Sequence, residues 1–141
     1  MLGFQVVGPR LSGKSCVVHR WAEGTWDATS APTHFQKARC KGSVTVWDAP
    51  GDTVPACPAA SIVYLVLDAS EPMADVGAWR HRIGDAARVV VVANKTDVRV
   101  RAWPAWMGAE AAQGIRAGYV EVSALTGRGM HQLFAPRPEA A

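Results

Sequence analysis

The chain has 141 residues, 49% of them hydrophobic, and a formal net charge of +3 at pH 7. This length and composition predict one domain with an ordinary core, and no apolar run is long enough to cross a membrane. The arginine and lysine residues are scattered, which argues against nucleic acid as a partner. Cys16, Cys40 and Cys57 are odd in number and far apart, so the sequence indicates neither a disulfide framework nor a cysteine metal site.

The first predicted elements surround a glycine-rich loop. Residues 4–7 are apolar and predict a buried strand, residues 8–15 spell G-x-x-x-x-G-K-S, and residues 15–21 predict a helix. A loop of this pattern between a strand and a helix is typical of a phosphate-binding site.

Each residue type in this loop suits an anion. Gly8 and Gly13 allow a tight turn whose backbone N–H groups, with the start of the next helix, face one ligand. Lys14 can reach the terminal phosphates, and Ser15 offers a hydroxyl of the kind that binds the magnesium ion of a nucleotide. The sequence therefore predicts that this loop holds a nucleotide.

The rest of the chain predicts alternating strands and helices. Residues 23–34 are rich in small and polar residues and predict a surface segment. Strands are predicted at 35–40, 43–47, 61–67, 89–93 and 119–122, and helices at 74–83, 104–113 and 130–135. This alternation predicts an α/β fold, a doubly wound and mostly parallel six-stranded sheet with flanking helices, over residues 1–135, followed by a short tail at 136–141.

Polar residues follow several of the predicted strands. Asp48 and Gly51 come after the strand at 43–47, residues 94–97 spell Asn-Lys-Thr-Asp, and residues 123–125 spell Ser-Ala-Leu. Because ligands bind at the carboxyl ends of the strands in such sheets, these residues are expected to meet the glycine-rich loop. An ordinary polar turn is the alternative interpretation of residues 94–97.

With the loop, these motifs occur in the order found in small GTPases of the Ras superfamily, and nearly the whole chain resembles that family. Counted from Lys14, the family register places Trp26 where an aromatic ring flanks the purine, and Pro32 and Thr33 at the first switch. Thr29 is a rival for the switch threonine, and Trp26 could instead be a surface or core aromatic residue. The resemblance implies a Ras-like P-loop G domain.

The resemblance also implies GTP or GDP with Mg²⁺ as the bound ligands. It implies that Ser15, Thr33 and Asp48 hold or support the metal, and that the Gly51 N–H meets the γ-phosphate. It implies contacts with the nucleotide from Gly8, Gly13, Lys14, Ser15, Cys16, Trp26, Thr33, Gly51, Asn94, Lys95, Asp97, Ser123, Ala124 and Leu125.

Asp97 explains a preference for guanine without reference to the family. A carboxylate accepts two hydrogen bonds, and guanine presents an N1–H and a 2-amino group, both of which adenine lacks. A site built in this way can reject the wrong base by about 10⁴ or more, because its buried acceptor is otherwise unpaired.

Two departures from the family pattern concern hydrolysis. The loop has Arg10 where a small residue is usual, and Asp52 stands where a glutamine usually orients the attacking water. Asp52 has no amide donor and would repel a γ-phosphate, whereas Arg10 could face solvent, clash with a switch or act as an arginine finger. The residues expected to bear on hydrolysis are Lys14, Thr33, Gly51, Arg10 and Asp52, and we expect slow hydrolysis with GTP binding retained.

The remaining departures are shortened elements. The hairpin at 35–47 is abbreviated, a proline-containing loop at 51–61 replaces the helix of the second switch, and the terminal helix is short. The short terminal helix is expected to leave an apolar flank that a partner could cover. Trp103 and Trp106 either anchor a partner or pack on their own sheet.

Two functions remain open from the sequence. One is a GTP-binding small GTPase-like protein that acts through partner proteins, and the other is a G-domain scaffold or adaptor subunit with little or no GTPase activity. Neither end of the chain has a secretory or lipidation signal, so we expect an intracellular, cytoplasmic location, with cytoskeleton or cilium as alternatives. Residues 32–33 and 47–48 favour the Rab-like branch. The combination of residues 7–14, 47–52 and 92–97 is similar to the divergent Rab-like subunits of intraflagellar transport.

Overall fold

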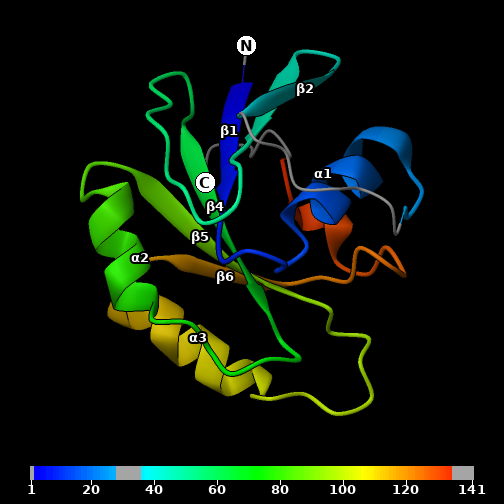
Figure 1. Cartoon of the computed structure of the whole chain (residues 1–141), viewed down its shortest axis with the longest axis vertical. Helices are drawn as coiled ribbons and strands as arrows, with labels where there is room; N and C mark the ends of the chain where they lie inside the picture. Colours follow the sequence, from blue (N-terminus) through cyan, green and yellow to red (C-terminus); the bar gives the residue numbers. More distant parts are fainter. Residues whose placement is uncertain (1, 28–35, 135–141) are drawn as a thin grey trace, which may run out of the picture.

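The computed structural model describes residues 2–27 and 36–134. Within these ranges, six strands form one sheet in the order β2-β3-β1-β4-β5-β6 (Figure 1). The strands are β1 (Leu2–Val7), β2 (Lys37–Lys41), β3 (Val44–Asp48), β4 (Ile62–Asp68), β5 (Arg88–Asn94) and β6 (Gly118–Glu121). Only β2 and β3 pair antiparallel among the described strands, and the predicted mostly parallel α/β sheet is confirmed.

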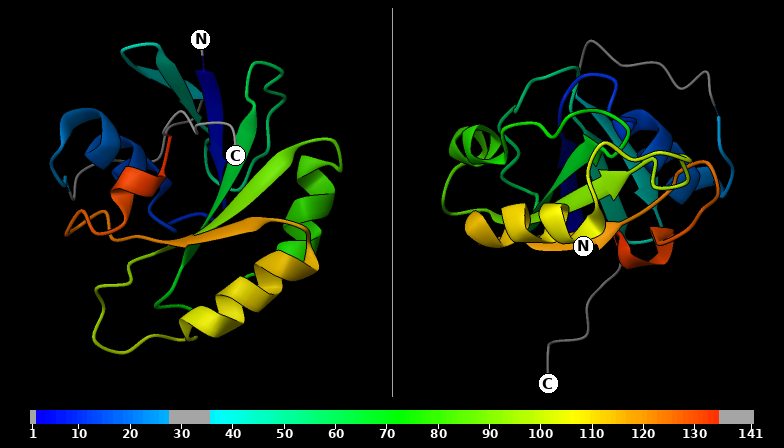
Figure 2. Two further views of the ribbon diagram at one scale, coloured as in Figure 1. Left: turned by 180° about the vertical axis from the view of Figure 1, so that it is seen from behind. Right: turned by 90° about the horizontal axis from the view of Figure 1, so that it is seen from below.

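Helices cover both faces of this sheet. They are α1 (Lys14–Glu23), α2 (Val76–Ile83), α3 (Ala105–Gly114) and a 3-10 turn, η1 (Met130–Gln132). Figure 2 shows α1 and η1 on one face and α2 and α3 on the other. The sheet is therefore doubly wound, as the alternation of elements predicts.

The strand sequences explain the two layers of the core. Alternate residues of a strand point to opposite faces, so Tyr64 and Val66 of β4 pack under α1, while Leu65 and Leu67 pack under α2 and α3. Both sets are buried, which is why β4 is a continuous apolar run in the sequence.

The shortened elements behave largely as expected. Residues 49–61 contain no helix, and the Gln5 side-chain amide donates to the Pro55 carbonyl at 2.7 Å, which fastens this loop to β1. The predicted helix at 130–135 is only the three-residue turn η1, and residues 135–141, including the predicted tail, lie outside the described residues. The chain between β3 and β4 is thus a loop that contacts β1.

The face next to η1 is closed at its centre, contrary to the expected open flank. The ring of Phe134 packs against Phe4, Tyr64 and Trp21, with centroid distances of 4.9 to 5.8 Å. A single aromatic side chain after η1 therefore covers a part of the sheet that we expected a longer helix to cover.

The two candidate anchor tryptophans have different environments. Trp103 is 2% exposed and its Nε1–H donates to the Glu71 carbonyl at 3.1 Å, so it belongs to the core. Trp106, on α3, is 63% exposed. No helix in the described ranges has the length and apolar character needed to cross a membrane.

Candidate functional site

A cavity of about 370 Å³ lies at the carboxyl ends of the strands, where the loops after β1, β3, β5 and β6 meet. This volume is within the range of small-molecule sites. Most of the predicted site residues line it, namely Arg10, Gly13, Lys14, Ser15, Cys16, Trp26, Gly51, Asn94, Lys95, Asp97, Ala124 and Leu125. Thr33 and its rival Thr29 lie outside the described residues.

The glycine-rich loop has a backbone that requires glycine at two positions. Gly8 and Gly13 have φ values of +148° and +94°, which side chains rarely allow. A Cβ at Gly8 would overlap the Val66 carbonyl oxygen, and one at Gly13 would overlap the side-chain nitrogen of Asn94. The loop is therefore packed closely against β4 and β5.

Lys14 is the buried cation at the centre of this loop. Its Nζ donates to the carbonyl oxygens of Gly8 at 2.9 Å, Pro9 at 3.1 Å and Gly51 at 2.8 Å. Burial lowers the pKa of Lys14, while the nearby carboxylates of Asp48 and Asp52 act in the opposite direction. The loop thus holds a positive charge where a phosphate would be expected to lie.

Ser15 and Asp48 form a pair that suits a divalent cation. The Ser15 hydroxyl donates to Asp48 Oδ2 at 2.7 Å, and Asp48 Oδ1 is buried without a hydrogen-bond partner in the described part of the chain. Burial is the main cause that raises the pKa of Asp48, and the Ser15 hydrogen bond and the Lys14 charge oppose it. An orphaned carboxylate oxygen beside a hydroxyl fits Mg²⁺.

The described residues do not supply a complete metal cage by themselves. No group of three or more His, Cys, Asp or Glu side chains in the described ranges could hold a metal. Mg²⁺ usually binds through one or two carboxylates together with phosphate oxygens and water. The Ser15 and Asp48 pair therefore fits an ion that arrives with a nucleotide.

Asn94 and Lys95 tie the loops around the cavity together. The Asn94 side chain donates to the Ser12 carbonyl at 3.1 Å and accepts from the Ala124 N–H at 3.2 Å. Lys95 Nζ donates to the Leu11 carbonyl at 3.1 Å and to Asp68 Oδ2 at 2.8 Å. The N–H of Ala124, a residue that the resemblance places in contact with the nucleotide, thus donates to the Asn94 side chain.

Asp97 lines the same cavity and lies in the loop after β5. Its Oδ1 accepts a hydrogen bond from the Ser123 hydroxyl at 2.6 Å, and that hydroxyl accepts from the Thr126 N–H at 3.1 Å. Since an ionised carboxylate has about four acceptor positions, this bond orients Asp97 and leaves capacity for a ligand. Ser123 is therefore a supporting residue behind Asp97.

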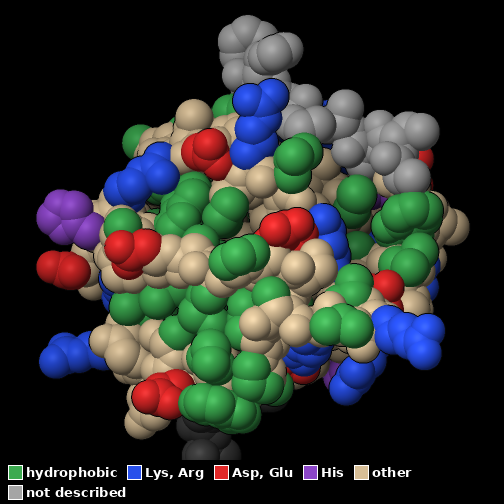
Figure 3. Space-filling view, turned by 60° about the horizontal axis from the view of Figure 1, so that its bottom comes forward, with side chains coloured by type: hydrophobic (Ala, Val, Ile, Leu, Met, Phe, Trp, Pro, Cys, Tyr) green, Lys and Arg blue, Asp and Glu red, His purple; other side chains and the backbone are tan. Residues whose placement is uncertain are grey.

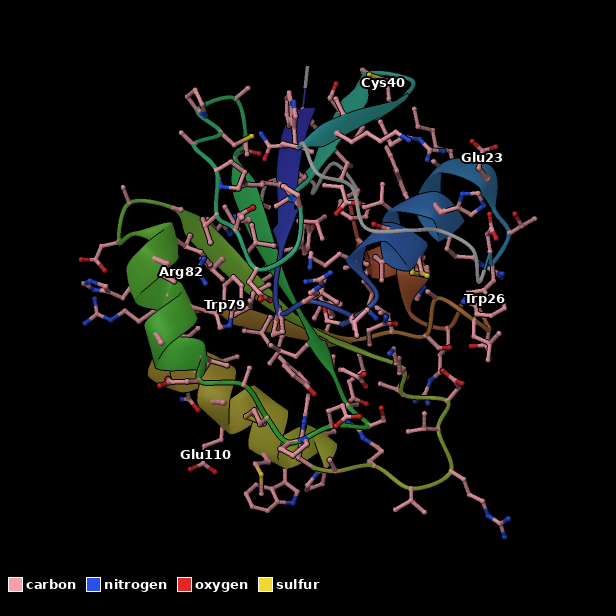
Figure 4. The ribbon with its side chains drawn as sticks, in the orientation of Figure 1. Glu23, Trp26, Cys40, Trp79, Arg82 and Glu110 are labelled. Carbon is pink, nitrogen blue, oxygen red and sulfur yellow. The ribbon has the colours of Figure 1, made fainter. Side chains whose placement is uncertain are left out.

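Trp26 and Cys16 lie along the wall formed by α1 and the segment after it. Trp26 lines the cavity and is 42% exposed, so it is not a core residue (Figure 4). The Cys16 thiol lies 3.6 Å from the Asp27 carbonyl, and burial raises its pKa. A raised pKa leaves this thiol protonated at neutral pH and argues against a reactive role.

Asp52 is bound on both sides by contacts that the sequence does not suggest. Its carboxylate accepts a hydrogen bond from the Arg10 N–H, and its carbonyl accepts one from the Arg82 guanidinium of α2. Arg10 itself has an exposed side chain that lines the cavity.

Sequence reasoning missed two residues of this site, Asp68 and Arg82. Asp68 ends the apolar run of β4, as Asp48 ends that of β3, and this position was a usable signal. Arg82 lies in the last turn of α2, and no local pattern distinguishes it from the neighbouring Arg80 and His81.

The comparison with known families agrees with the arrangement of these loops. The model of the Ras family matches residues 4–139, which include all the described motifs of the cavity. No curated protein matches the chain. Because the match extends over nearly the whole length, the chain belongs to the Ras family of small GTPases.

Proposed function

We propose that this protein binds GDP and GTP with Mg²⁺, hydrolyses GTP slowly, and acts inside the cell through partner proteins. The observation that carries the proposal is that two sets of residues meet at one cavity. In the first set, Lys14 and Ser15 line the cavity, Ser15 bonds to Asp48, and one Asp48 oxygen has no partner among the described residues. In the second set, Asp97 lines the same cavity and accepts a hydrogen bond from Ser123 with acceptor capacity left for a ligand.

Different residues bind the phosphates, the base and the metal ion. The amides of the glycine-rich loop and Lys14 bind the phosphates, and Asp97 accepts from the N1–H and 2-amino group of guanine. Lys95 presents its aliphatic stem and Trp26 its ring to the base. Mg²⁺ held by Ser15 and supported by Asp48 would neutralise charge on the terminal phosphates. Thr33 is proposed as a further metal ligand by its register alone.

Slow hydrolysis follows from the chemistry of Asp52. Its side chain offers only acceptors, so it cannot donate to a γ-phosphate as a glutamine amide can, and its negative charge opposes the charge of the phosphate. Asp52 is also engaged by the Arg10 N–H. Water is then positioned poorly for in-line attack.

Single-turnover hydrolysis of saturating GTP tests this proposal. We expect Asp52→Gln to hydrolyse GTP at least about tenfold faster than the wild type, because positioning of the nucleophile is restored. Asp85→Asn is the matched control, since Asp85 is exposed and lies after α2. Equal rates in the wild type and Asp52→Gln would contradict the role of Asp52.

A scaffold or adaptor subunit is the second candidate function. The contacts of Lys14 with Gly51 and of Asp52 with Arg10 and Arg82 hold the loop after β3 with protein groups alone, which suits a fixed structure. Exposed Trp106 and Met107 on α3 offer a partner surface, and Figure 3 shows hydrophobic side chains gathered on the face where α3 lies.

The nucleotide content of the purified protein separates the two functions. The protein is prepared without added nucleotide and denatured, and the released nucleotide is identified and counted. About one guanine nucleotide per chain supports the first function. A folded protein that releases none, and that takes up none on addition of Mg²⁺ and GDP, supports the scaffold.

A further inference from the structure

The loop after β3 is fastened to the phosphate-binding loop and to α2 by three hydrogen bonds. Lys14 Nζ donates to the Gly51 carbonyl at 2.8 Å, the Arg10 N–H donates to the Asp52 carboxylate, and the Arg82 guanidinium donates to the Asp52 carbonyl. We call Arg10, Asp52 and Arg82 the Asp52 latch. The latch joins segments that are 30 and 42 residues apart in sequence.

All three N–H donors of the Lys14 ammonium group are already used, so a phosphate can bond to it only by replacing one acceptor. An ammonium group has three N–H donors, and the three carbonyl oxygens of Gly8, Pro9 and Gly51 account for them. Gly8 and Pro9 belong to the loop itself, whereas Gly51 comes from the loop after β3. A phosphate that bonds to Lys14 can therefore replace Gly51 and leave the other two contacts in place.

The Asp52 carboxylate adds an electrostatic condition. The backbone N–H groups of such a loop are the donors that bind phosphates. One of them, the Arg10 N–H, already donates to the Asp52 carboxylate. A γ-phosphate in this region would bring further negative charge close to Asp52. Two negative groups that lie close together repel each other unless one is neutralised or moves away.

Arg82 anchors the latch to α2. Its guanidinium lies 4.4 Å from the centroid of the Trp79 ring, and Trp79 is buried between α2 and the sheet (Figure 4). The start of α2 is fixed by the Asp75 carboxylate, which accepts from the Ala78 N–H at 3.0 Å. A movement of the Asp52 backbone away from the Arg10 N–H therefore breaks or strains a second contact that is itself supported.

We propose that the Asp52 latch makes this site bind a guanosine diphosphate in preference to a triphosphate, with Asp52 as the specificity residue and Arg82 as a positioning residue. The inference rests on the proposed function, since it concerns the same nucleotide site. The diphosphate leaves the latch closed, because it brings no γ-phosphate close to Asp52. The triphosphate binds only when the latch has opened, and the free energy of opening is subtracted from its affinity.

The test is an equilibrium competition with the full chain. A fluorescent GDP is displaced by unlabelled GDP or by a non-hydrolysable GTP analogue, in Mg²⁺ at fixed ionic strength. We expect the wild type to bind GDP at least about tenfold more tightly, the ratio produced by about 1.4 kcal/mol of differential binding. Asp52→Asn and Arg82→Gln should lower this ratio towards one by tightening the analogue, with GDP affinity little changed.

Two control variants match the changes in charge. Asp85→Asn and Arg88→Gln alter exposed side chains outside the latch and should keep the wild-type ratio. GDP affinity reports whether each variant is folded. Where Asp52→Asn fails to bind GDP, Arg82→Gln provides the test.

The outcomes distinguish failure of the latch proposal from failure of the proposed function. A wild type that binds both nucleotides equally overturns the latch and leaves the proposed function standing. A ratio that persists in both Asp52→Asn and Arg82→Gln also overturns the latch. A folded wild type that binds neither nucleotide overturns the proposed function itself, and with it this inference.

Discussion

At the scale of single residues, Asp97 gives the sharpest test of base recognition. Asp97→Asn replaces one acceptor by an amide donor, so the 2-amino group of guanine meets a donor, while xanthine presents a carbonyl there. We expect GDP to bind at least about 100-fold more weakly, because a polar group in the site is left unpaired, and xanthosine diphosphate to bind more tightly than GDP. Competition binding with the two diphosphates measures both changes.

Ser123→Ala is the companion variant. It removes the 2.6 Å bond that orients Asp97 but leaves the carboxylate, so GDP affinity should fall by less than in Asp97→Asn, with no gain for xanthosine diphosphate. An unchanged base preference in Asp97→Asn would show that Asp97 does not contact the base.

Glu121 gives a prediction for pH. Its carboxylate accepts two bonds from Arg101, at 2.9 and 2.7 Å, and these lower its pKa below the ordinary value. A lowered pKa in the folded state stabilises the protein at neutral pH, and this gain is lost as pH falls through the folded pKa. Arg101→Met should reduce the free energy of unfolding at pH 7 by up to about 1 kcal/mol, discounted for solvent screening, and the pH-dependent part should shrink as pH falls below the ordinary glutamate pKa and through the lowered folded pKa.

Urea unfolding at pH 7 and pH 3 measures this difference. Arg99→Met is the control, because Arg99 is exposed in the same loop. The loss of stacking between Arg101 and Trp103, at 5.5 Å, does not depend on pH and appears as a constant offset. A deficit that stays equal at both pH values would assign the whole effect to this stacking.

The residues of the site differ in how well the sequence predicts them. Lys14, Ser15, Asn94 and Asp97 lie in contiguous motifs whose chemistry is legible without a structure, and all four line the cavity. Arg82 could not be predicted, because its role depends on a contact with Asp52 across 30 residues of sequence. Sequence motifs identify the residues that would contact a ligand. Residues that position them, such as Arg82, are identified only from tertiary contacts.

At the scale of elements, α3 approaches β6 at a glycine. A Cβ at Gly108 would lie 2.5 Å from the Tyr119 hydroxyl oxygen and 2.6 Å from a ring carbon of Trp103. Gly108→Ala should therefore destabilise the protein by about 1–3 kcal/mol through overpacking, although alanine is the better helix former. Thermal or urea unfolding measures the change.

Gly114, the last residue of α3, is the matched control. A Cβ there has no neighbour within 4 Å, so Gly114→Ala should be neutral or slightly stabilising. Equal effects of the two substitutions would mean that helix propensity, and not contact with Tyr119, decides stability at Gly108.

Element prediction succeeds where burial imposes a pattern. The strand predicted at 61–67 is observed as β4 (Ile62–Asp68), because a strand covered on both faces must be apolar throughout. The helix predicted at 130–135 is shorter, since the chain forms only η1 before Phe134 turns inward with a φ of +56°. The packing of one ring into an aromatic cluster carries no sequence period, so the closed flank could not be predicted.

At the scale of the whole molecule, the site joins loops that follow separate strands. Asn94 links the loop after β1 to the loop after β6, and Lys95 links the first of these to Asp68 at the end of β4. A ligand in the cavity then contacts segments whose separation requires the sheet to open. Nucleotide binding should therefore stabilise the entire domain as one cooperative unit.

Thermal unfolding with and without ligand tests this coupling. At free GDP about 100 times its Kd, with Mg²⁺, we expect a gain of about 2.7 kcal/mol, which for a domain of this size raises Tm by roughly 10 °C. Chelation of Mg²⁺ should reduce the shift, because Asp48 then faces the phosphates without a cation between them. ADP at the same concentration is the control, since the proposed role of Asp97 is to discriminate against adenine. An equal shift of Tm with ADP would mean that the phosphate-binding loop alone stabilises the fold on binding. A shift specific to GDP would show that Asp97 contributes together with that loop.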